Sequence, residues 1–332
     1  AVLNAAGPWS EWFLSETIRK DKDENKGTYS RDACFVIKRK FDSNKAIAVQ
    51  GRTKDPDALL SRPARHLFLV PWRDYTLVGV WHIVWKKHPE DVTVERSEIE
   101  SFIDEISWAY PGLDIDSDDV EIWNAGLVPF GENEEGEEDL SYGKRSNLID
   151  HKKEDGIDGL VTLIGIRYTT ARGDAATALD LICSKLGVNV SRPATESVPV
   201  AGGDIDNFEN LVDTLRQKAG PGLADDSIRA LAHNYGTDAS EVLELVGQDE
   251  SMGKTVGDSR VLRAEIVHAI NKEMAWTLSD VVFRRTDLAT GGFPGDSAIR
   301  ASAEVMAGVL GWDEQEIQSQ IKTVTQRFPA WK

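Results

Sequence analysis

The sequence has little cysteine and no long apolar run. Only two cysteines occur in 332 residues, and Cys34 and Cys183 lie far apart in apolar surroundings. A disulfide framework or a zinc site needs cysteines or histidines at short, regular spacings. We therefore expect two buried, reduced thiols, as in a cytoplasmic protein, and no metal site. No apolar stretch reaches the ~18–20 residues that a helix needs to cross a bilayer.

Positive charge is also scarce. The chain carries 38 Lys and Arg against 56 Asp and Glu, which gives a formal net charge of −18. Nucleic-acid binding needs clustered cations that neutralise phosphates, and broad adhesion to anionic lipid needs a basic surface. The composition therefore argues against both, whereas the excess acid favours solubility.

Complete nucleotide-binding and hydrolase motifs are absent from the sequence. No GxGxxG, HExxH or GxSxG pattern occurs. The segment "GQDESMGKT" at 247–255 has five residues between its glycines. The P-loop pattern requires one fewer, so we interpret this segment as a loop between helices.

The first part of the chain is rich in short strand patterns. Hydrophobic residues form 41% of the sequence, which is enough for two domains at this length. Charged, Gly-containing segments at 19–32 and 131–140 predict exposed loops. The spacing of the short apolar runs favours an antiparallel sheet, with "WRDY" as one of its turns. The predicted strands are 1–4, 33–38, 46–50, 66–71, 76–85, 120–130, 148–151 and 160–164.

Helical patterns interrupt these strands and then replace them. In "SEIESFIDEISWAY", 97–110, apolar residues recur at helical spacing, and Ser97 and Glu100 are spaced as a capping box. The Pro- and Gly-rich stretch 191–208 predicts a linker. We therefore predict an α+β chain with an antiparallel-sheet domain over 1–190 and an all-α domain over 209–332. Helices are predicted at 9–14, 97–110, 169–187, 211–218, 225–235, 239–246, 259–274, 277–283, 297–310 and 314–328.

The stretch "LIGIRYTTARG" joins an apolar strand to a helix through a polar turn. Backbone N–H groups at a helix start attract an anion or an electron-rich ring, and Thr169 or Thr170 can cap the helix. Arg167 and Arg172 add positive charge at the same place. The alternative, an ordinary capped helix with both arginines in solvent, remains open at this point.

Three other segments are candidates for contact with a ligand. Small residues in "AAGPW", 5–9, let the backbone approach a ligand closely, and "NAGLVPFGE", 124–132, is a similar strand-to-loop junction. In "GVWHIVWKK" the imidazole of His82 lies among large apolar residues. Such a histidine is usually a core or edge residue, but one that faces a pocket can act as an acid or base.

Four motifs in a fixed order resemble the FAD-dependent glycerol-3-phosphate dehydrogenase family of D-amino-acid-oxidase-like flavoproteins. They are "LNAAGPW", "LFLVPWRDYTLVGVWHIVWKKHPEDVTVERSEI", "IWNAGLVPF" and "LIGIRYTTAR". The segments "IRALAHNYGTDASEVLELV" and "LRAEIVHAINKEMAWTLSDVVFRRTDLATGG" resemble the C-terminal domain of the same family. The resemblance covers nearly the whole chain. It implies part of a flavin-binding domain and hydride transfer from sn-glycerol 3-phosphate to FAD, giving dihydroxyacetone phosphate.

The resemblance also implies a set of site residues. Arg167 stands where the family usually has Lys and is implied to bind the substrate phosphate, for which an arginine offers a bidentate fork. We predict His82 as the acid or base. The implied cofactor-binding residues are Gly7, Pro8, Gly165, Ile166, Arg167, Tyr168, Thr169 and Thr170.

In this family the GxGxxG segment precedes the "AAGPW" motif. We therefore expect that this segment lies upstream of Ala1, that the chain alone is incomplete and inactive, and that it binds FAD weakly or not at all. The implied partners are a small-molecule substrate, a membrane quinone or other electron acceptor, and a second copy in a homo-oligomer, without nucleic acid. The implied location is cytoplasmic, or peripheral on the inner membrane face.

Two departures from the family pattern leave other functions open. Gly79-Val80-Trp81-His82 replaces a Gly-Thr-Thr-Asp motif, and Val128 replaces an arginine of the family. One alternative is a flavin oxidoreductase that acts on another hydroxy acid, polyol or amine. The absence of a GxGxxG motif leaves open a second alternative, a truncated interaction module without catalytic activity.

Overall fold

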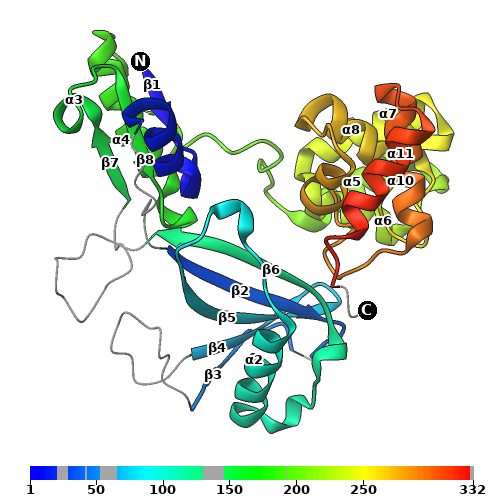
Figure 1. The fold of residues 1–332 in the computed structure, drawn as a ribbon. Helices are drawn as coiled ribbons and strands as arrows, with labels where there is room; N and C mark the ends of the chain where they lie inside the picture. The colour runs from blue at the N-terminus through cyan, green and yellow to red at the C-terminus, as the bar shows by residue number, and fades with distance from the viewer. Residues whose placement is uncertain (21–28, 42, 53–65, 130–145, 192, 330–332) are drawn as a thin grey trace. The chain divides into compact units, whose positions relative to one another are not determined.

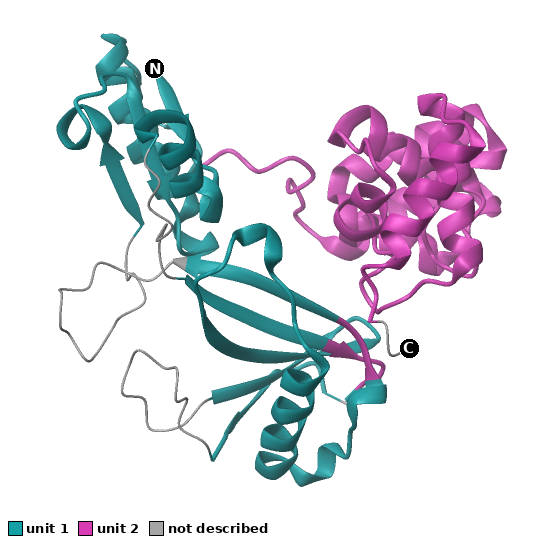
Figure 2. Cartoon of the chain, viewed as in Figure 1, with its two compact units in different colours: residues 1–35, 41–119, 123–196 teal, residues 36–40, 120–122, 197–332 magenta. Residues whose placement is uncertain are grey.

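A computed structural model gives the fold of two compact units (Figures 1 and 2). Unit 1 comprises residues 1–35, 41–119 and 123–196, and unit 2 comprises 36–40, 120–122 and 197–332. Every helix in the described ranges is too short or too polar to span a lipid bilayer. The structure describes residues 1–20, 29–41, 43–52, 66–129, 146–191 and 193–329, so the predicted acidic loop at 131–140 lies outside the described residues.

One part of unit 1 is a three-stranded sheet in the order β1-β8-β7. β1 (Val2–Asn4) runs parallel to β8 (Leu160–Ile164), whereas β7 (Asn147–Asp150) is antiparallel to β8. The helix α4 (Ala171–Leu186) follows β8 and packs against both β8 and β1. The chain therefore returns over the sheet directly after its central strand.

Short helical segments connect these strands. A 3-10 turn at Gly7–Trp9 continues into α1 (Ser10–Phe13) and then into a π-helical turn that ends at Arg19. The helix predicted at 9–14 is thus part of a longer helical segment. Between β7 and β8 lies α3 (His151–Glu154), so His151 begins a helix and does not end a strand as predicted.

The second sheet of unit 1 has five strands in the order β3-β4-β5-β2-β6. β4 and β5 form an antiparallel hairpin in which Trp72 lies opposite Tyr75, as the "WRDY" turn predicts. The mixed α and β content with antiparallel pairing confirms the predicted fold class. The strand bounds are β2 (Tyr29–Ile37), β3 (Ile47–Gln50), β4 (His66–Trp72), β5 (Tyr75–Trp85) and β6 (Val120–Pro129).

The helix α2 (Arg96–Ala109) covers one face of this sheet. The Trp81 ring of β5 stacks on the Phe102 ring of α2 with centroids 4.5 Å apart. Trp81 is only 3% exposed, so this departure from the family pattern is a core residue that fastens the helix to the sheet.

The predicted start of β2 and the predicted cap of α2 are wrong for a common reason. β2 begins at Tyr29, inside the segment predicted as a solvated loop, and Arg31 is only 1% exposed. The Arg31 guanidinium donates to Glu98 at 2.8 and 3.0 Å. Glu98 also forms the capping box of α2 with Glu95, in place of the predicted Ser97 and Glu100. One carboxylate thus serves both elements, which makes a polar strand end stable in the core.

Unit 2 is helical after residue 207 and has its own apolar core. Val212, Leu215, Ile228, Leu231 and Val242 are among its buried members. The predicted helix 259–274 begins four residues later, and the one predicted at 277–283 is a short α-helix followed by a π-helical turn at Val281–Arg285. The helices are α5 (Phe208–Ala219), α6 (Asp225–Tyr235), α7 (Ala239–Gln248), α8 (Arg263–Glu273), α9 (Leu278–Asp280), α10 (Asp296–Leu310) and α11 (Glu314–Thr325).

The main-chain atoms of Gly202 and Gly236, two glycines of unit 2, lie in close contact. Gly236 has φ +56°, and a Cβ at this position would lie 1.9 Å from the carbonyl oxygen of Gly202. That oxygen accepts a hydrogen bond from the N–H of Thr237 at 3.0 Å. The contact therefore fixes the beginning of the segment 197–332 against the end of α6 and leaves no room for a side chain at Gly236.

We expect Gly236→Ala to lower the free energy of unfolding by about 2 kcal/mol, because it adds both backbone strain and a clash with main-chain atoms. Gly247→Ala is the matched control. A Cβ at Gly247, in α7, meets no atom within 4 Å among the residues that the structure describes, so this change should stabilise by about 0.5–1 kcal/mol. Urea unfolding followed by far-UV circular dichroism measures both variants. A Gly236→Ala chain as stable as the parent would contradict the inference that the contact with Gly202 leaves no room for a side chain.

Candidate functional site

Two of the sequence-predicted segments come together at one edge of the three-stranded sheet. β1 and β8 are parallel, with Asn4 directly opposite Thr162. Gly7 and Gly165 each follow this pair by three residues, so the Ala5–Pro8 and Gly165–Thr170 turns both leave the carboxyl end of the sheet. Ligands of open α/β sheets bind at this end.

The two turns present exposed backbone and open space. Gly165 and the residues from Arg167 to Thr170 are exposed, Ile166 is half-buried, and Gly7 and Pro8 are half-buried. A Cβ built on Gly7 or Gly165 meets no atom of the described residues within 4 Å, and Gly7 has φ +58°, a conformation that favours glycine. The main chain at both glycines is therefore open on the side where a side chain would stand.

The start of α4 differs in detail from the predicted cap. Thr170 is the N-cap residue, but its hydroxyl accepts no capping hydrogen bond. It lies instead 3.1 Å from the Arg167 carbonyl oxygen and 2.9 Å from Asp174 Oδ2, both of which are acceptors. The side chain thus ties the 3-10 turn Tyr168–Thr170 to the first turn of α4, while the first N–H groups of such a turn have no partner within the helix.

Charged side chains of both signs lie at this turn. Arg172 pairs with Glu196 at 3.5 Å, with both side chains more than half exposed. Asp174 places a carboxylate in the first turn of α4. Within the described part of this turn, the positive charge available to a ligand is therefore that of Arg167 and of the helix N-terminus.

His82 comes from the other sheet of unit 1. It is half-buried on β5, and because side chains alternate along a strand it shares a face with Val80, opposite Trp81. Val80 is 44% exposed, so this face is partly open, whereas the Trp81 face is closed by α2. Val128 is half-buried on β6 of the same sheet. Arg167 and His82 thus belong to different sheets, and their roles remain predictions.

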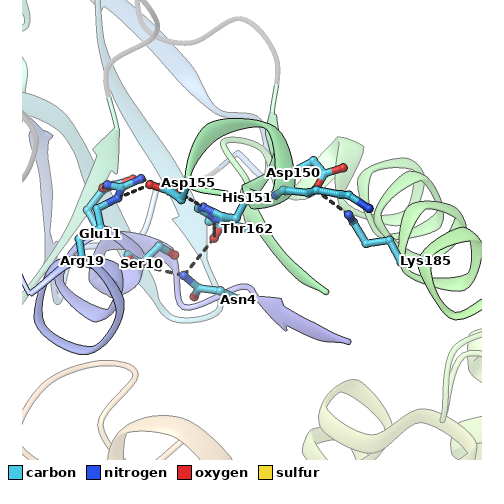
Figure 3. A network of polar contacts seen from close by, with 10 residues as sticks. Asn4, Ser10, Glu11, Arg19, Asp150, His151, Asp155, Thr162 and Lys185 are labelled. Atoms are coloured by element: carbon cyan, nitrogen blue, oxygen red, sulfur yellow. Dashed lines mark hydrogen bonds and ion pairs between the residues drawn. The ribbon is translucent and has the colours of Figure 1, made fainter. Parts of the chain in front are cut away.

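A group of buried polar residues lies next to the two turns, and the sequence patterns do not predict it (Figure 3). It includes His151, whose side chain is fully buried, and Thr162 and Asn4, which are polar residues inside short apolar strands. A polar side chain in such a strand signals a buried hydrogen bond, because leaving it unpaired is costly. At the edge of this group, Lys185 Nζ of α4 lies 2.6 Å from Asp150 Oδ1.

Asp155 anchors one end of this group. Arg19 donates to both of its carboxylate oxygens, at 2.9 and 3.2 Å, and His151 Nδ1 lies 2.5 Å from Oδ2. The hydrogen bonds from Arg19 and then from His151 lower the pKa of Asp155 from 3.8 to about 2. The carboxylate is therefore ionised over the whole neutral and mildly acidic range.

This shift predicts a specific acid sensitivity. A depressed carboxyl pKa adds stability that is fully present above the unfolded value and is lost as pH falls through the folded value. For Asp155 the loss should run from about pH 4 to about pH 2. We expect urea unfolding of the parent and of Arg19→Gln to differ by a constant amount above pH 4 and to converge below it. A difference that stays constant down to pH 2 would exclude this source of acid sensitivity.

Both cysteines are free, but only Cys183 is fully buried. Cys34 is half-buried, and burial raises the pKa of its thiol to about 11, against a smaller lowering by a hydrogen bond from the Asn124 backbone. The described residues hold no group of three or more His, Cys, Asp or Glu side chains that could bind a metal ion.

The helical part matches a known protein family. Residues 193–317 match the family described as the C-terminal domain of alpha-glycerophosphate oxidase. This match begins inside the predicted linker and covers most of the predicted helical domain. The boundary predicted between sheet domain, linker and helical domain remains a prediction.

Curated relatives match nearly the whole chain. A glycerol-3-phosphate dehydrogenase of Synechocystis is 27% identical over 97% of this chain and 57% of its own length. An aerobic glycerol-3-phosphate dehydrogenase of Staphylococcus saprophyticus is 24% identical over 97% of this chain and 56% of its own length. The chain therefore spans just over half the length of these relatives.

A solved structure has the same fold. The glycerol-3-phosphate dehydrogenase of Bacillus halodurans, determined in complex with FAD, superposes with a TM-score of 0.76 at 23% identity. The match covers 98% of this chain and 61% of that one. Residues 193–317 are thus similar to the C-terminal domain of alpha-glycerophosphate oxidase, and the chain is similar to glycerol-3-phosphate dehydrogenases over nearly its whole length, as the order of its motifs predicts.

Proposed function

We propose that the chain is part of an FAD-dependent oxidoreductase of the glycerol-3-phosphate dehydrogenase type, which converts sn-glycerol 3-phosphate to dihydroxyacetone phosphate. The observation that carries the proposal is the parallel pairing of β1 with β8, which places the Ala5–Pro8 and Gly165–Thr170 turns at one sheet edge. The names of the curated relatives support the substrate, and the FAD complex of the Bacillus halodurans protein supports the cofactor.

The residues at the sheet edge fit a flavin. Gly7 and Gly165 leave open space where a Cβ would otherwise stand, and a flat ring can lie against the exposed main chain of the second turn. The N-terminus of the helical segment that begins at Tyr168 offers N–H groups and a partial positive charge. Bound FAD supplies the hydride acceptor.

The chain's own residues would serve the substrate. The exposed guanidinium of Arg167 would bind the phosphate with two parallel hydrogen bonds. The imidazole of His82, on the partly open face of the five-stranded sheet, would take the hydroxyl proton as hydride leaves the same carbon. The helix start at Tyr168–Thr170 would stabilise negative charge that develops at the ring.

We further propose that electrons pass to a membrane quinone and that the protein works as a homo-oligomer, cytoplasmic or peripheral to the inner membrane face. Size-exclusion chromatography with light scattering measures the oligomer. Reduction of a soluble quinone analogue during substrate turnover measures the acceptor.

The experiment that tests the main proposal uses the protein expressed from its complete reading frame. Anaerobic addition of sn-glycerol 3-phosphate should bleach the flavin absorption band. Glycerol, lactate, glycine and a D-amino acid serve as controls, because they carry a hydroxyl or amine without the phosphate. Bleaching by one of these and not by glycerol 3-phosphate would move the function to another hydroxy acid, polyol or amine. A purified protein without flavin would favour a non-catalytic interaction module.

We expect the 332-residue chain alone to bind FAD weakly or not at all. The two turns contact one part of the cofactor, and the sequence has no GxGxxG loop to hold the pyrophosphate. Titration of FAD fluorescence with the purified chain measures the affinity. Stoichiometric FAD in the purified chain would contradict this expectation.

A further inference from the structure

A continuous series of buried hydrogen bonds runs from His151 to the turn after β1 (Figure 3). His151 Nε2 lies 2.8 Å from the Oγ1 of Thr162, and both side chains are fully buried. Thr162 Oγ1 accepts a hydrogen bond from Asn4 Nδ2 at 3.3 Å. Asn4 Oδ1 in turn accepts from the N–H of Ala6 at 3.2 Å. The series therefore connects α3, β8 and β1 with the main chain at the sheet edge.

The donors and acceptors of this series agree in direction. Because the Asp155 carboxylate is ionised, its partner His151 Nδ1 carries the hydrogen. In the neutral imidazole Nε2 is then an acceptor, and the Thr162 hydroxyl donates to it. This leaves a lone pair on Oγ1 for the N–H of Asn4. Each group has a partner, and fully satisfied buried networks are rigid.

Asn4 fastens both ends of the turn. Its amide nitrogen also donates to the carbonyl oxygen of Ser10 at 3.3 Å, while its oxygen accepts from Ala6. These partners fix the orientation of the amide, because nitrogen and oxygen cannot exchange places without losing them. From the other sheet, the Tyr29 hydroxyl donates to the Pro8 carbonyl oxygen at 2.9 Å. The Ala5–Pro8 turn is thus held by side chains that lie outside it.

We propose that His151 is a positioning residue that holds the Ala5–Pro8 turn beside the flavin through Thr162 and Asn4. The presence of the flavin in this inference rests on the proposed function. The hydrogen bonds that fix the turn exist in the chain without the flavin. The hydrogen bonds of the His151 imidazole go to Asp155 and Thr162, so the series reaches the turn through Thr162 and Asn4. A change at His151 that loosens the turn therefore distinguishes a connected series from a set of independent local contacts.

Thr162→Val and Thr162→Ser form the matched pair for the first test. Valine has nearly the same shape but leaves His151 Nε2 and Asn4 Nδ2 without their shared partner, whereas serine keeps the hydroxyl. The rate of hydrogen–deuterium exchange in the peptide that contains Ala6 measures how firmly the Ala5–Pro8 turn is fixed in the 332-residue chain. We expect exchange about tenfold faster in Thr162→Val and within about twofold of the parent in Thr162→Ser.

Thr177→Val is the control, because the Thr177 hydroxyl donates to the Gly173 carbonyl oxygen on the exposed side of α4. It should leave the Ala6 peptide unchanged. His151→Gln should accelerate exchange of the same peptide, although three hydrogen bonds and two residues, Thr162 and Asn4, separate the side chain from Ala6. Unchanged exchange in a folded His151→Gln chain would overturn the role of His151, and unchanged exchange in Thr162→Val would overturn the whole series.

The second test measures FAD affinity of the protein from the complete reading frame. We expect Thr162→Val to raise the FAD dissociation constant about tenfold and Thr162→Ser to leave it within about twofold. Unchanged exchange in Thr162→Val, or equal acceleration in Thr162→Ser, would overturn the inference. Faster exchange with unchanged FAD affinity would overturn its flavin part. A parent protein that holds no FAD would overturn the proposed function, while the exchange experiment still decides the hold on the turn.

Discussion

Arg167→Ala should lower kcat/KM for sn-glycerol 3-phosphate about 100-fold, because hydrogen bonds between charged groups contribute about 1.5–3 kcal/mol. The Arg167 side chain is exposed at the turn after β8, directly before the 3-10 turn Tyr168–Thr170. The guanidinium is therefore exposed on the residue that directly precedes the helical segment, and it can bind an anion without first leaving a buried position. Steady-state kinetics with a soluble electron acceptor measures the effect.

Two further variants separate charge from geometry. Arg167→Lys keeps the positive charge and loses the bidentate fork, so it should fall between the parent and the alanine variant. Arg172→Ala removes an arginine five residues along the chain that is paired with Glu196 at 3.5 Å. It should leave kcat/KM within about twofold, since exposed ion pairs contribute little. Equal kinetics for Arg167→Ala and the parent would remove Arg167 from the site.

Arg31→Met should lower the free energy of unfolding by about 3 kcal/mol, because removing one member of a buried ion pair leaves the other charge without compensation. Arg31 is 1% exposed and Glu98 24% exposed, which places the effect at the lower end of the usual range for buried pairs. Methionine fills much of the same volume, so the loss reflects the charge and hydrogen bonds more than a cavity. Urea unfolding monitored by tryptophan fluorescence measures the change.

The double variant Arg31→Met/Glu98→Gln provides the internal control. Glutamine can still accept the Glu95 N–H that Glu98 Oε2 holds at 2.7 Å, but it carries no charge. Part of the lost stability should therefore return. Arg96→Met, which breaks an exposed pair with Glu100, should have a much smaller effect than Arg31→Met. A double variant less stable than Arg31→Met would mean that the lost hydrogen bonds, rather than the uncompensated charge, dominate.

The sequence predicts well those elements whose buried residues are determined by residues nearby in the chain. The hairpin at Trp72–Tyr75 follows from alternating apolar residues on both sides of a polar turn. The bounds of α6, Asp225–Tyr235, agree with the prediction. One apolar stripe defines this helix, and the helix-breaking residues Gly222 and Gly236 lie on either side of it. The start of β2 could not be predicted, since Arg31 is buried only because Glu98 lies 67 residues further along the chain.

For the candidate site the sequence predicts the turns but not what lies beneath them. Gly7 and Gly165 are visible as small residues after apolar strands, and the structure puts their turns at one sheet edge. The pairing of Asn4 with Thr162 depends on strand register, which a single sequence does not specify over such a distance. Polar residues inside "VLN" and "LVTLI" were the available signal, but it gives no partner.

The parallel pairing of β1 with β8 also sets an order of events during synthesis. Asn4 and Thr162 are 158 residues apart along the chain. At about 5–20 residues per second, a ribosome needs roughly 8–30 s between the two residues. During that interval β1 cannot pair with β8, and closing so long a loop adds an entropic barrier. The Ala5–Pro8 turn is therefore made well before the Gly165–Thr170 turn, and it takes its final shape only after β8 has been made.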